Sequence, residues 1–392
     1  MLRNPRTSRP FVLVVGAALA AAGLPLLTGA PAQATTAFPL TYHCTTDPNV
    51  GEYDVSAVVD TNAPATLGAG LSAPITVTSD VTIPDTLATY LRDTAHVASV
   101  DGTSQATGTV GGVSRTSTLT IARTPVPAAG TPMHLVGTGP GGSITAGAVG
   151  STILIGAGGF TATLNGYDTA GTKILGPVVF TCVLTPPNGQ DLLVDSVSVV
   201  QTPTTTTLTV TSPVEYGAPV SASVTVSQAG TNAKPAGTVA FTYAGTTVTV
   251  VVKGGKASAE LPAALTMGAN QVTAVFTPTD KTVAPSSATT AFTVVRGSTT
   301  TTASAVYRAA TDRLVGKALV EAVHGTEVAG EVKFILKRNG TKIRTAIVAL
   351  NAKDKAKKVF KNISKAGTYV VVAKYLGSAT LKRSKDRAKV II

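Results

Sequence analysis

Residues 201–210 read QTPTTTTLTV and residues 298–307 read STTTTASAVY, so a run of four threonines occurs twice in the chain. An alternating apolar run follows each tract. Threonine is polar and favours strands, so such a tract suits a linker that continues into an edge strand. The repetition predicts that each tract opens one copy of the same β-sheet module. O-linked glycosylation of the tracts is an open alternative.

Two further pairs of blocks extend this repeat. GTVAFTYAGTTV (237–248) matches GEVKFILKRNGTKI (330–343) through the pattern G-x-V-x-F, and GANQVTAVF (268–276) matches GTYVVVAKY (367–375). The alignment pairs Phe241 with Phe334 and Phe276 with Tyr375. We expect each pair to be buried at equivalent positions. Three matched blocks in the same order define an internal repeat.

The blocks alternate with a period of two, which indicates half-buried strands. Asn339–Gly340 and Gly254–Gly255 each predict a two-residue hairpin turn, because both positions tolerate positive φ. About seven short strands per copy predict a β-sandwich of immunoglobulin type over residues 201–295 and again over 298–392. The T-x-T-x-L-x-V opening and the G-x-V-x-F block resemble bacterial Ig-like repeats of exported surface proteins.

The first 34 residues contain, in this order, the basic region, apolar region and cleavage site of a secretory signal peptide. Three arginines precede the apolar stretch FVLVVGAALAAAGLPLL, and APAQA then places small residues at Ala32 and Ala34. Two glycines and a proline in the apolar stretch disfavour a membrane anchor, so we expect cleavage after Ala34. No second apolar run of about 20 residues follows, so we expect no transmembrane segment after cleavage. The chain is predicted to be exported.

In an exported protein the two cysteines are expected to be oxidised. Cys44 lies in LTYHCTT and Cys182 in VVFTCVL, and an even number in an oxidising compartment predicts one disulfide. A metal-bound or reactive pair would need further ligands, and nearby His43 points to the opposite face of any strand. We therefore predict a disulfide-closed, β-sandwich-like domain over residues 35–198. Its single short helix is TLATYLRD (86–93), with Asp85 or Thr86 as the cap.

Residues 35–198 also resemble a family of secreted actinobacterial domains with no assigned function. Such domains open with a Y-x-C block, carry a P-A-T-x-x-x-G block and close with a C-x-L block near a G-Q-D turn. The matching residues here are Tyr42, Cys44, Pro64, Ala65, Thr66, Gly70, Cys182, Leu184, Gly189, Gln190 and Asp191. The resemblance implies an extracellular location and an architecture, and no activity.

Motifs for catalysis or cofactor binding are weak. Residues 137–142 satisfy G-x-G-x-x-G, but a strand-like run follows and Pro140 interrupts the loop, so we predict a turn rather than a dinucleotide site. No histidine stands at metal-ligand spacing. We assign no catalytic, metal or cofactor-binding residue and predict that the chain is no enzyme. The acidic residues sit in polar stretches typical of solvated carboxylates or of a weak calcium site: Asp47, Glu52, Asp54, Asp80 and Asp85.

Charge is distributed unevenly along a chain whose net charge is +12. Residues 296–392 hold 21 Lys and Arg against 6 Asp and Glu, whereas residues 16–295 hold 8 against 14. This asymmetry predicts contact between the last module and an anionic cell-wall polymer or extracellular glycan. We expect the contact residues to be Lys355, Lys357, Lys382 and Lys385. Solvated strand faces protected by lysines are the alternative, and nucleic acid is disfavoured because the aromatics are spaced as core residues.

Two functions fit these features. The first is a non-enzymatic, exported cell-surface protein whose Ig-like modules act as spacers or adhesion units. The alternative is a carbohydrate-binding accessory module of an extracellular degradative system. That alternative needs an exposed aromatic platform, for which the candidates are Tyr42, Tyr53, Tyr90 and Tyr167.

Overall fold

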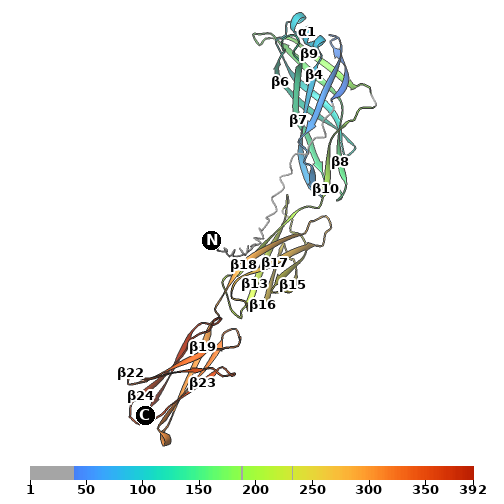
Figure 1. Cartoon of the computed structure of the whole chain (residues 1–392). Helices are drawn as coiled ribbons and strands as arrows, with labels where there is room; N and C mark the ends of the chain where they lie inside the picture. Colours follow the sequence, from blue (N-terminus) through green and yellow to red (C-terminus); the bar gives the residue numbers. More distant parts are fainter. Residues whose placement is uncertain (1–38, 187–188, 232) are drawn as a thin grey trace, which may run out of the picture.

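The structure, a computed structural model, describes residues 39–186, 189–231 and 233–392, which form three β-modules arranged end to end (Figure 1). The predicted all-β fold class is confirmed. The signal peptide predicted for residues 1–34 lies outside the described residues. No helix within the described ranges is long and apolar enough to cross a membrane.

The N-terminal module is one ten-stranded sheet in the order β3-β10-β8-β5-β6-β7-β4-β2-β1-β9. Strand β8 pairs with β5 along one edge, and along its other edge it pairs with both β9 and β10. The sheet therefore closes on itself. The strands are β1 (Leu40–Asp47), β2 (Glu52–Thr61), β3 (Thr66–Gly68), β4 (Ser72–Ile83), β5 (Ser99–Val110), β6 (Val113–Pro125), β7 (Met133–Thr145), β8 (Thr152–Tyr167), β9 (Lys173–Leu184) and β10 (Leu193–Val200).

A short helical segment covers one end of the closed sheet (Figure 1). Helix α1 (Asp85–Thr89) continues into a π-helical turn, η1 (Tyr90–Thr94), in the place where the sequence predicts a helix. The predicted cap is wrong, because the helix begins after Pro84 and no side chain caps its first turn. Leu87 and Leu91 turn inward and join the apolar core at this end.

The two repeats are sandwiches with matching strand order. In the first, sheet β11-β13-β16 faces sheet β12-β18-β17-β14-β15; in the second, β19-β20-β23 faces β25-β24-β21-β22. The first contains β11 (Thr204–Val210), β12 (Val214–Glu215), β13 (Pro219–Gln228), β14 (Gly237–Tyr243), β15 (Thr246–Val251), β16 (Lys256–Ala263), β17 (Gly268–Pro278) and β18 (Ser286–Val295). The second contains β19 (Thr299–Arg308), a 3-10 turn η2 (Ala309–Thr311), β20 (Arg313–Ala322), β21 (Glu331–Arg338), β22 (Thr341–Ala349), β23 (Lys355–Phe360), β24 (Thr368–Tyr375) and β25 (Ser384–Ile391).

The register of the repeat is confirmed. Val239 pairs with Phe276 between β14 and β17, and Val332 pairs with Tyr375 at the same place between β21 and β24. The aromatic side chains of the alignment are at most 1% exposed in both copies. Equivalent residues therefore fill the centre of each sandwich.

Two of the three predicted turns are present and the third is wrong. Asn339–Gly340 forms the expected hairpin between β21 and β22, with positive φ at both residues. Gly254–Gly255 also forms the expected two-residue turn, with positive φ at both glycines and an antiparallel bridge between Lys253 and Lys256. Beyond this bridge the chain passes from β15 into β16 of the opposite sheet. The turn predicted for residues 137–142 is wrong, because this stretch lies inside β7. Its glycines let neighbouring backbones approach closely; a Cβ at Gly139 would lie 2.0 Å from the Thr118 carbonyl oxygen.

The threonine tracts form edge strands β11 and β19, as expected. They also tie the two sheets of each sandwich together. Thr206 Oγ1 lies 2.7 Å from Ser286 Oγ on β18, and Thr301 Oγ1 lies 2.6 Å from Ser384 Oγ on β25. Alternate threonines thus face inward and hydrogen-bond across the sandwich edge. This removes Thr206 and Thr301, which are buried, from the residues open to glycosylation in the folded chain.

Candidate functional site

Seven basic side chains share one outer face of the second repeat. They project from the sheet β22-β21-β24-β25, because strand alternation puts residues of the same parity on one side. In one row across the sheet, Lys333 pairs with Lys374 and Lys374 with Lys385. We call this surface the basic face: Lys333, Lys337, Lys342, Lys374, Lys385, Arg387 and Lys389.

The basic face carries little compensating charge. Like charges directly opposite each other on neighbouring strands are destabilising. Among the described residues, the ion pairs of the second repeat involve Lys382 and His324, and none reaches the basic face. Glu331 is the acidic residue on this side of the sheet, whereas Asp386 turns to the other side and accepts a hydrogen bond from the Ala303 amide at 2.8 Å. The face is therefore a surface of unneutralised positive charge.

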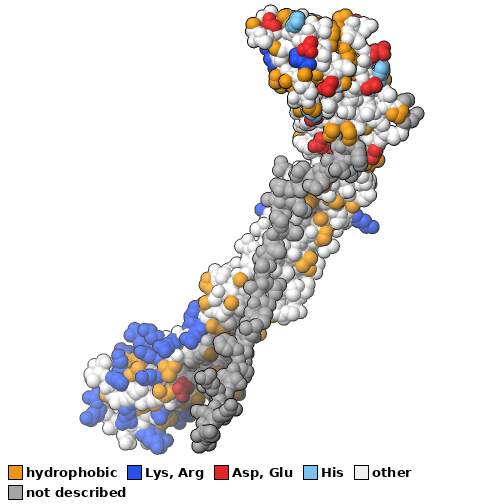
Figure 2. Space-filling view, turned by 45° about the horizontal axis from the view of Figure 1, so that its top comes forward, with side chains coloured by type: hydrophobic (Ala, Val, Ile, Leu, Met, Phe, Trp, Pro, Cys, Tyr) orange, Lys and Arg blue, Asp and Glu red, His pale blue; other side chains and the backbone are white. Residues whose placement is uncertain are grey.

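The equivalent surface of the first repeat is neutral. Where the second repeat has the row Lys333–Lys374–Lys385, the first has Ala240, Val275 and Ser287. The next row of the first repeat consists of threonines, and Thr242 bonds Thr247 at 2.9 Å while Thr273 bonds Thr289 at 3.1 Å. The fold thus forms without any charge at these positions. Figure 2 shows the resulting contrast, with Lys and Arg gathered on the C-terminal module and Asp and Glu concentrated at the opposite end.

The structure separates the four lysines that the sequence analysis selected. All four side chains are exposed. Lys385 belongs to the basic face, but Lys355 and Lys357 lie on β23 in the opposite sheet. Lys382 lies at the joint between the two repeats, where its Nζ is 2.5 Å from Glu215 Oε1.

Glu215, the last residue of β12, holds the joint between the two repeats. The Ser298 amide and hydroxyl both donate to its carboxylate, at 2.9 and 2.8 Å, and His324 Nε2 lies 3.6 Å away. Hydrogen bonds from Lys382 and then from Ser298 lower the pKa of Glu215 to about 2. Tyr216 packs against the cores of both repeats, so polar and apolar contacts meet at one point.

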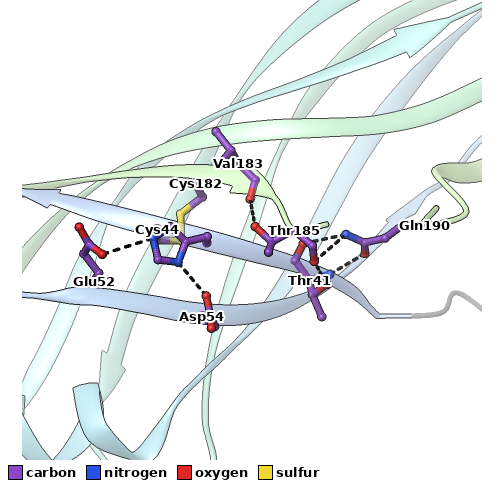
Figure 3. Close-up of polar contacts among 9 residues, drawn as sticks. Thr41, Cys44, Glu52, Asp54, Cys182, Val183, Thr185 and Gln190 are labelled. Atoms are coloured by element: carbon purple, nitrogen blue, oxygen red, sulfur yellow. Dashed lines mark hydrogen bonds and ion pairs between the residues drawn. A yellow bond between two sulfur atoms is a disulfide. The ribbon is translucent and has the colours of Figure 1, made fainter. Parts of the chain in front are cut away.

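Polar contacts and a disulfide connect β1 with its neighbours in the N-terminal module (Figure 3). Cys44 on β1 and Cys182 on β9 are register partners joined by a disulfide, with their Cα atoms 4.0 Å apart. Gln190 accepts a hydrogen bond from the Thr41 amide at 2.8 Å and donates to its carbonyl at 3.0 Å. The Y-x-C and G-Q-D blocks therefore fix β1 in place.

Of the four tyrosines considered for an aromatic platform, Tyr53 and Tyr90 are half-buried and pack against the apolar core of the N-terminal module. Tyr42 is 1% exposed and packs edge-on against Phe160, and the Arg123 guanidinium covers the Tyr167 ring at 3.5 Å. Exposed His43 Nδ1 lies 2.8 Å from Asp54 Oδ1, and this hydrogen bond raises the pKa of His43. Within the described ranges, no group of three or more His, Cys, Asp or Glu side chains is placed to hold a metal ion.

Sequence reasoning missed six of the seven residues of the basic face. Their alternation, as in KFILK of β21, was visible in the sequence. Which lysines meet depends on strand order and register, and neither can be read from spacing. The missed residues are Lys333, Lys337, Lys342, Lys374, Arg387 and Lys389.

Comparison with known proteins adds a family match for one module. Residues 41–194 match the model of a family of unknown function, DUF6801, which confirms the resemblance to a family without assigned function. The match covers less than half of the chain. No curated protein matches the sequence.

Several solved structures are similar in part. A tetra-tandem repeat from the extending region of a large adhesion protein is 14% identical, with 93% of this chain and 92% of that chain covered and a TM-score of 0.28. Chicken interferon gamma receptor alpha chain is 12% identical, with coverage of 49% and 98% and a TM-score of 0.29. The D0-D1 domain of intimin is 18% identical, with coverage of 48% and 100% and a TM-score of 0.19. Such scores carry no argument about function.

Proposed function

We propose that this protein is a non-enzymatic, exported surface protein that contacts an anionic envelope polymer through its basic face. The polymer would carry phosphate or carboxylate groups at intervals, as cell-wall polymers and acidic glycans do. The two sandwiches act as spacers or adhesion units between that contact and the N-terminal module. The disulfide, which is typical of oxidising compartments, supports the extracellular location.

The main observation in support of this proposal is the row Lys333–Lys374–Lys385. Three lysines side by side cost stability, and the first repeat demonstrates that neutral residues fit the same rows. A bound polyanion would offset the repulsion and explain why the charges are retained. Contact of this kind acts over about 8 Å at physiological ionic strength, so added salt should weaken it.

The arrangement of the modules supports the proposed spacer role. Figure 1 places the N-terminal module and the C-terminal end at opposite ends of an elongated chain. Glu215 and Tyr216 fasten the second joint, and at the first joint the buried Thr202 hydroxyl donates to the Ala69 carbonyl at 2.8 Å. Anchoring by the basic face would therefore hold the N-terminal module away from the polymer.

A binding experiment with a defined polymer tests the proposal. The full chain would be loaded on immobilised poly(glycerol phosphate) and eluted with a salt gradient. We expect the variant K333Q/K374Q/K385Q to elute at clearly lower salt than the wild type. The matched control is K317Q/K355Q/K357Q, which removes the same charge from the exposed outer side of β20 and β23 and should elute close to the wild type.

Equal shifts for the two variants would mean that net charge matters and the basic face does not. A shift confined to the control would move the contact to the sheet that holds Lys355 and Lys357. Either result would overturn the proposed site. Circular dichroism of each variant would establish that the sandwich remains folded.

A further inference from the structure

Three of the seven residues of the basic face lie in one line along β25. Lys385, Arg387 and Lys389 occupy alternate positions of this strand, so their exposed side chains all point to the outer face. The residues between them, Asp386 and Ala388, point to the other side of the sheet. No other strand in the part of the chain that the structure describes has three basic residues at alternate positions. We call Lys385, Arg387 and Lys389 the β25 track.

Aliphatic side chains separate most of the β25 track from the other lysines of the basic face. Lys385 has a lysine opposite it on β24, whereas Arg387 lies opposite Val372 and Lys389 lies opposite Val370. On its other side the track borders no further strand of this sheet, because β25 is the edge strand. A linear polyanion that follows β25 therefore meets three cations in succession, whereas one that crosses the sheet beside Arg387 or Lys389 meets aliphatic side chains.

The interval between charges differs along the strand and across the sheet. Alternate residues of an antiparallel strand are about 6.8 Å apart, and neighbouring strands are about 4.8 Å apart. In poly(glycerol phosphate) linked through the terminal hydroxyls of glycerol, six chain bonds separate successive phosphorus atoms. Two residues of a polypeptide also contain six chain bonds, which span about 6.6–7.2 Å when extended. One phosphate therefore falls beside each cation of the β25 track, whereas the row Lys333–Lys374–Lys385 is too closely spaced to match successive phosphates.

We propose that the basic face binds a polyanion that has one phosphate for every six chain bonds and lies along the β25 track. Poly(glycerol phosphate) is the simplest polymer of this class. The inference rests on the proposed function and adds to it the class of polymer and the direction in which the polymer lies. Each phosphate accepts a charge-assisted hydrogen bond from one side chain of the track. Lys333 and Lys374 add positive potential beside the phosphate at Lys385.

Single-stranded nucleic acid also has six chain bonds between phosphates, but the surroundings of the track do not suit it. Proteins bind the bases of single strands by stacking them on aromatic side chains. The outer neighbours of the track on β24 are Val370, Val372 and Lys374, and the two tyrosines of β24, Tyr369 and Tyr375, are buried. Within residues 233–392, this face therefore offers contacts to a phosphate backbone and no stacking surface for bases.

Two oligomers of equal charge test the interval in the full chain. Oligo(glycerol phosphate) and oligo(ribitol phosphate) with six phosphates each differ in spacing, because ribitol places eight chain bonds between phosphates. We expect the wild type to bind the glycerol oligomer about threefold more tightly, since the ribitol oligomer matches only two of the three cations at once and a single exposed ion pair is weak. Fluorescence anisotropy of the labelled oligomers at one fixed ionic strength would measure both affinities.

Two variants that remove the same charge test whether the preference depends on β25. K385Q/R387Q/K389Q removes the track, and K333Q/K337Q/K374Q removes three charges from the rest of the basic face. The first repeat has Ser287, Thr289 and Ala291 at the track positions, so uncharged residues are compatible with this fold. The track variant should bind both oligomers equally weakly. The second variant should bind both oligomers more weakly than the wild type and keep the threefold preference.

Equal affinity of the wild type for the two oligomers would overturn the inferred interval and leave the proposed polymer contact intact. A preference that the track variant keeps, or that the second variant loses, would contradict the assignment to β25. If neither oligomer bound the wild type, this inference and the proposed function would both be wrong. Tighter binding of an oligodeoxythymidylate with six phosphates than of the glycerol oligomer would replace the inference with a nucleic-acid ligand.

Discussion

The two Ig-like repeats share a core and differ in their surfaces. Phe241 and Phe334 occupy the same position in the same register, and in each copy inward-facing threonines hydrogen-bond a serine across the sandwich edge. Yet the outer face of the sheet β22-β21-β24-β25 bears seven basic residues in the second copy, whereas the equivalent face of β15-β14-β17-β18 in the first copy is neutral. Buried positions and the strand edge therefore define the fold, while the outer face is free to acquire a function.

The most damaging change to either copy should be removal of its central aromatic ring. We expect F241A and F334A each to lower the free energy of unfolding of their own repeat by about 4 kcal/mol, because both rings are fully buried. The chain contains no Trp, so hydrogen exchange of peptides from each repeat is the appropriate measurement. Effects that differ severalfold would show that the two cores are not equivalent.

The N-terminal module depends on a covalent link that both repeats lack. Replacing both cysteines, as in C44A/C182A, should lower its free energy of unfolding by about 2–5 kcal/mol, because the disulfide closes a loop of 138 residues. Exchange in the repeats should not change. Equal destabilisation of all three modules would indicate that they unfold as one unit.

The joint between the repeats should respond to acid. The pKa of Glu215 is lowered to about 2 from an ordinary value near 4.5, so the stabilisation from its contacts is complete above pH 4.5 and is lost as the pH falls through about 2. E215Q should weaken the joint by about 2 kcal/mol at pH 7. Energy transfer between dyes on the two repeats would follow both changes, and acid-insensitive transfer in the wild type would contradict this account.

The smallest effect concerns the threonine edges. T206V and T301V should each cost about 1 kcal/mol, since each removes a hydrogen bond to a serine of the opposite sheet. Their exposed neighbours provide matched controls: T205V and T300V should stay within about 0.5 kcal/mol of the wild type in thermal unfolding. Control variants as destabilising as T206V and T301V would refute the role assigned to the inward threonines.

The sequence alone predicted the features that depend on periodicity and repetition. The register of the two repeats and the Asn339–Gly340 turn could be read from matched blocks, because buried positions recur at fixed spacing. The basic face could not, since Lys333 and Lys374 lie far apart in the chain and meet only through strand order. The closure of the N-terminal sheet depends in the same way on β8 pairing with three strands.

The glycine-rich stretch of β7 is a second feature that could not be predicted from the sequence. Residues 137–142 look like a turn because glycine and proline usually mark one. Inside a closed sheet the same glycines permit close approach of strands, as Gly139 does against β6. Local composition cannot distinguish these two uses, because the difference lies in the neighbouring strand.

The most direct test of the account transfers the first copy's surface onto the second. In the full chain, K333A/K374V/K385S installs the residues that Ala240, Val275 and Ser287 provide at the equivalent positions. The measurement is the salt concentration that releases the protein from isolated cell envelopes. We predict release at clearly lower salt than for the wild type, with unchanged or higher thermal stability because the like-charge row is removed. Retention equal to that of the wild type would contradict the account.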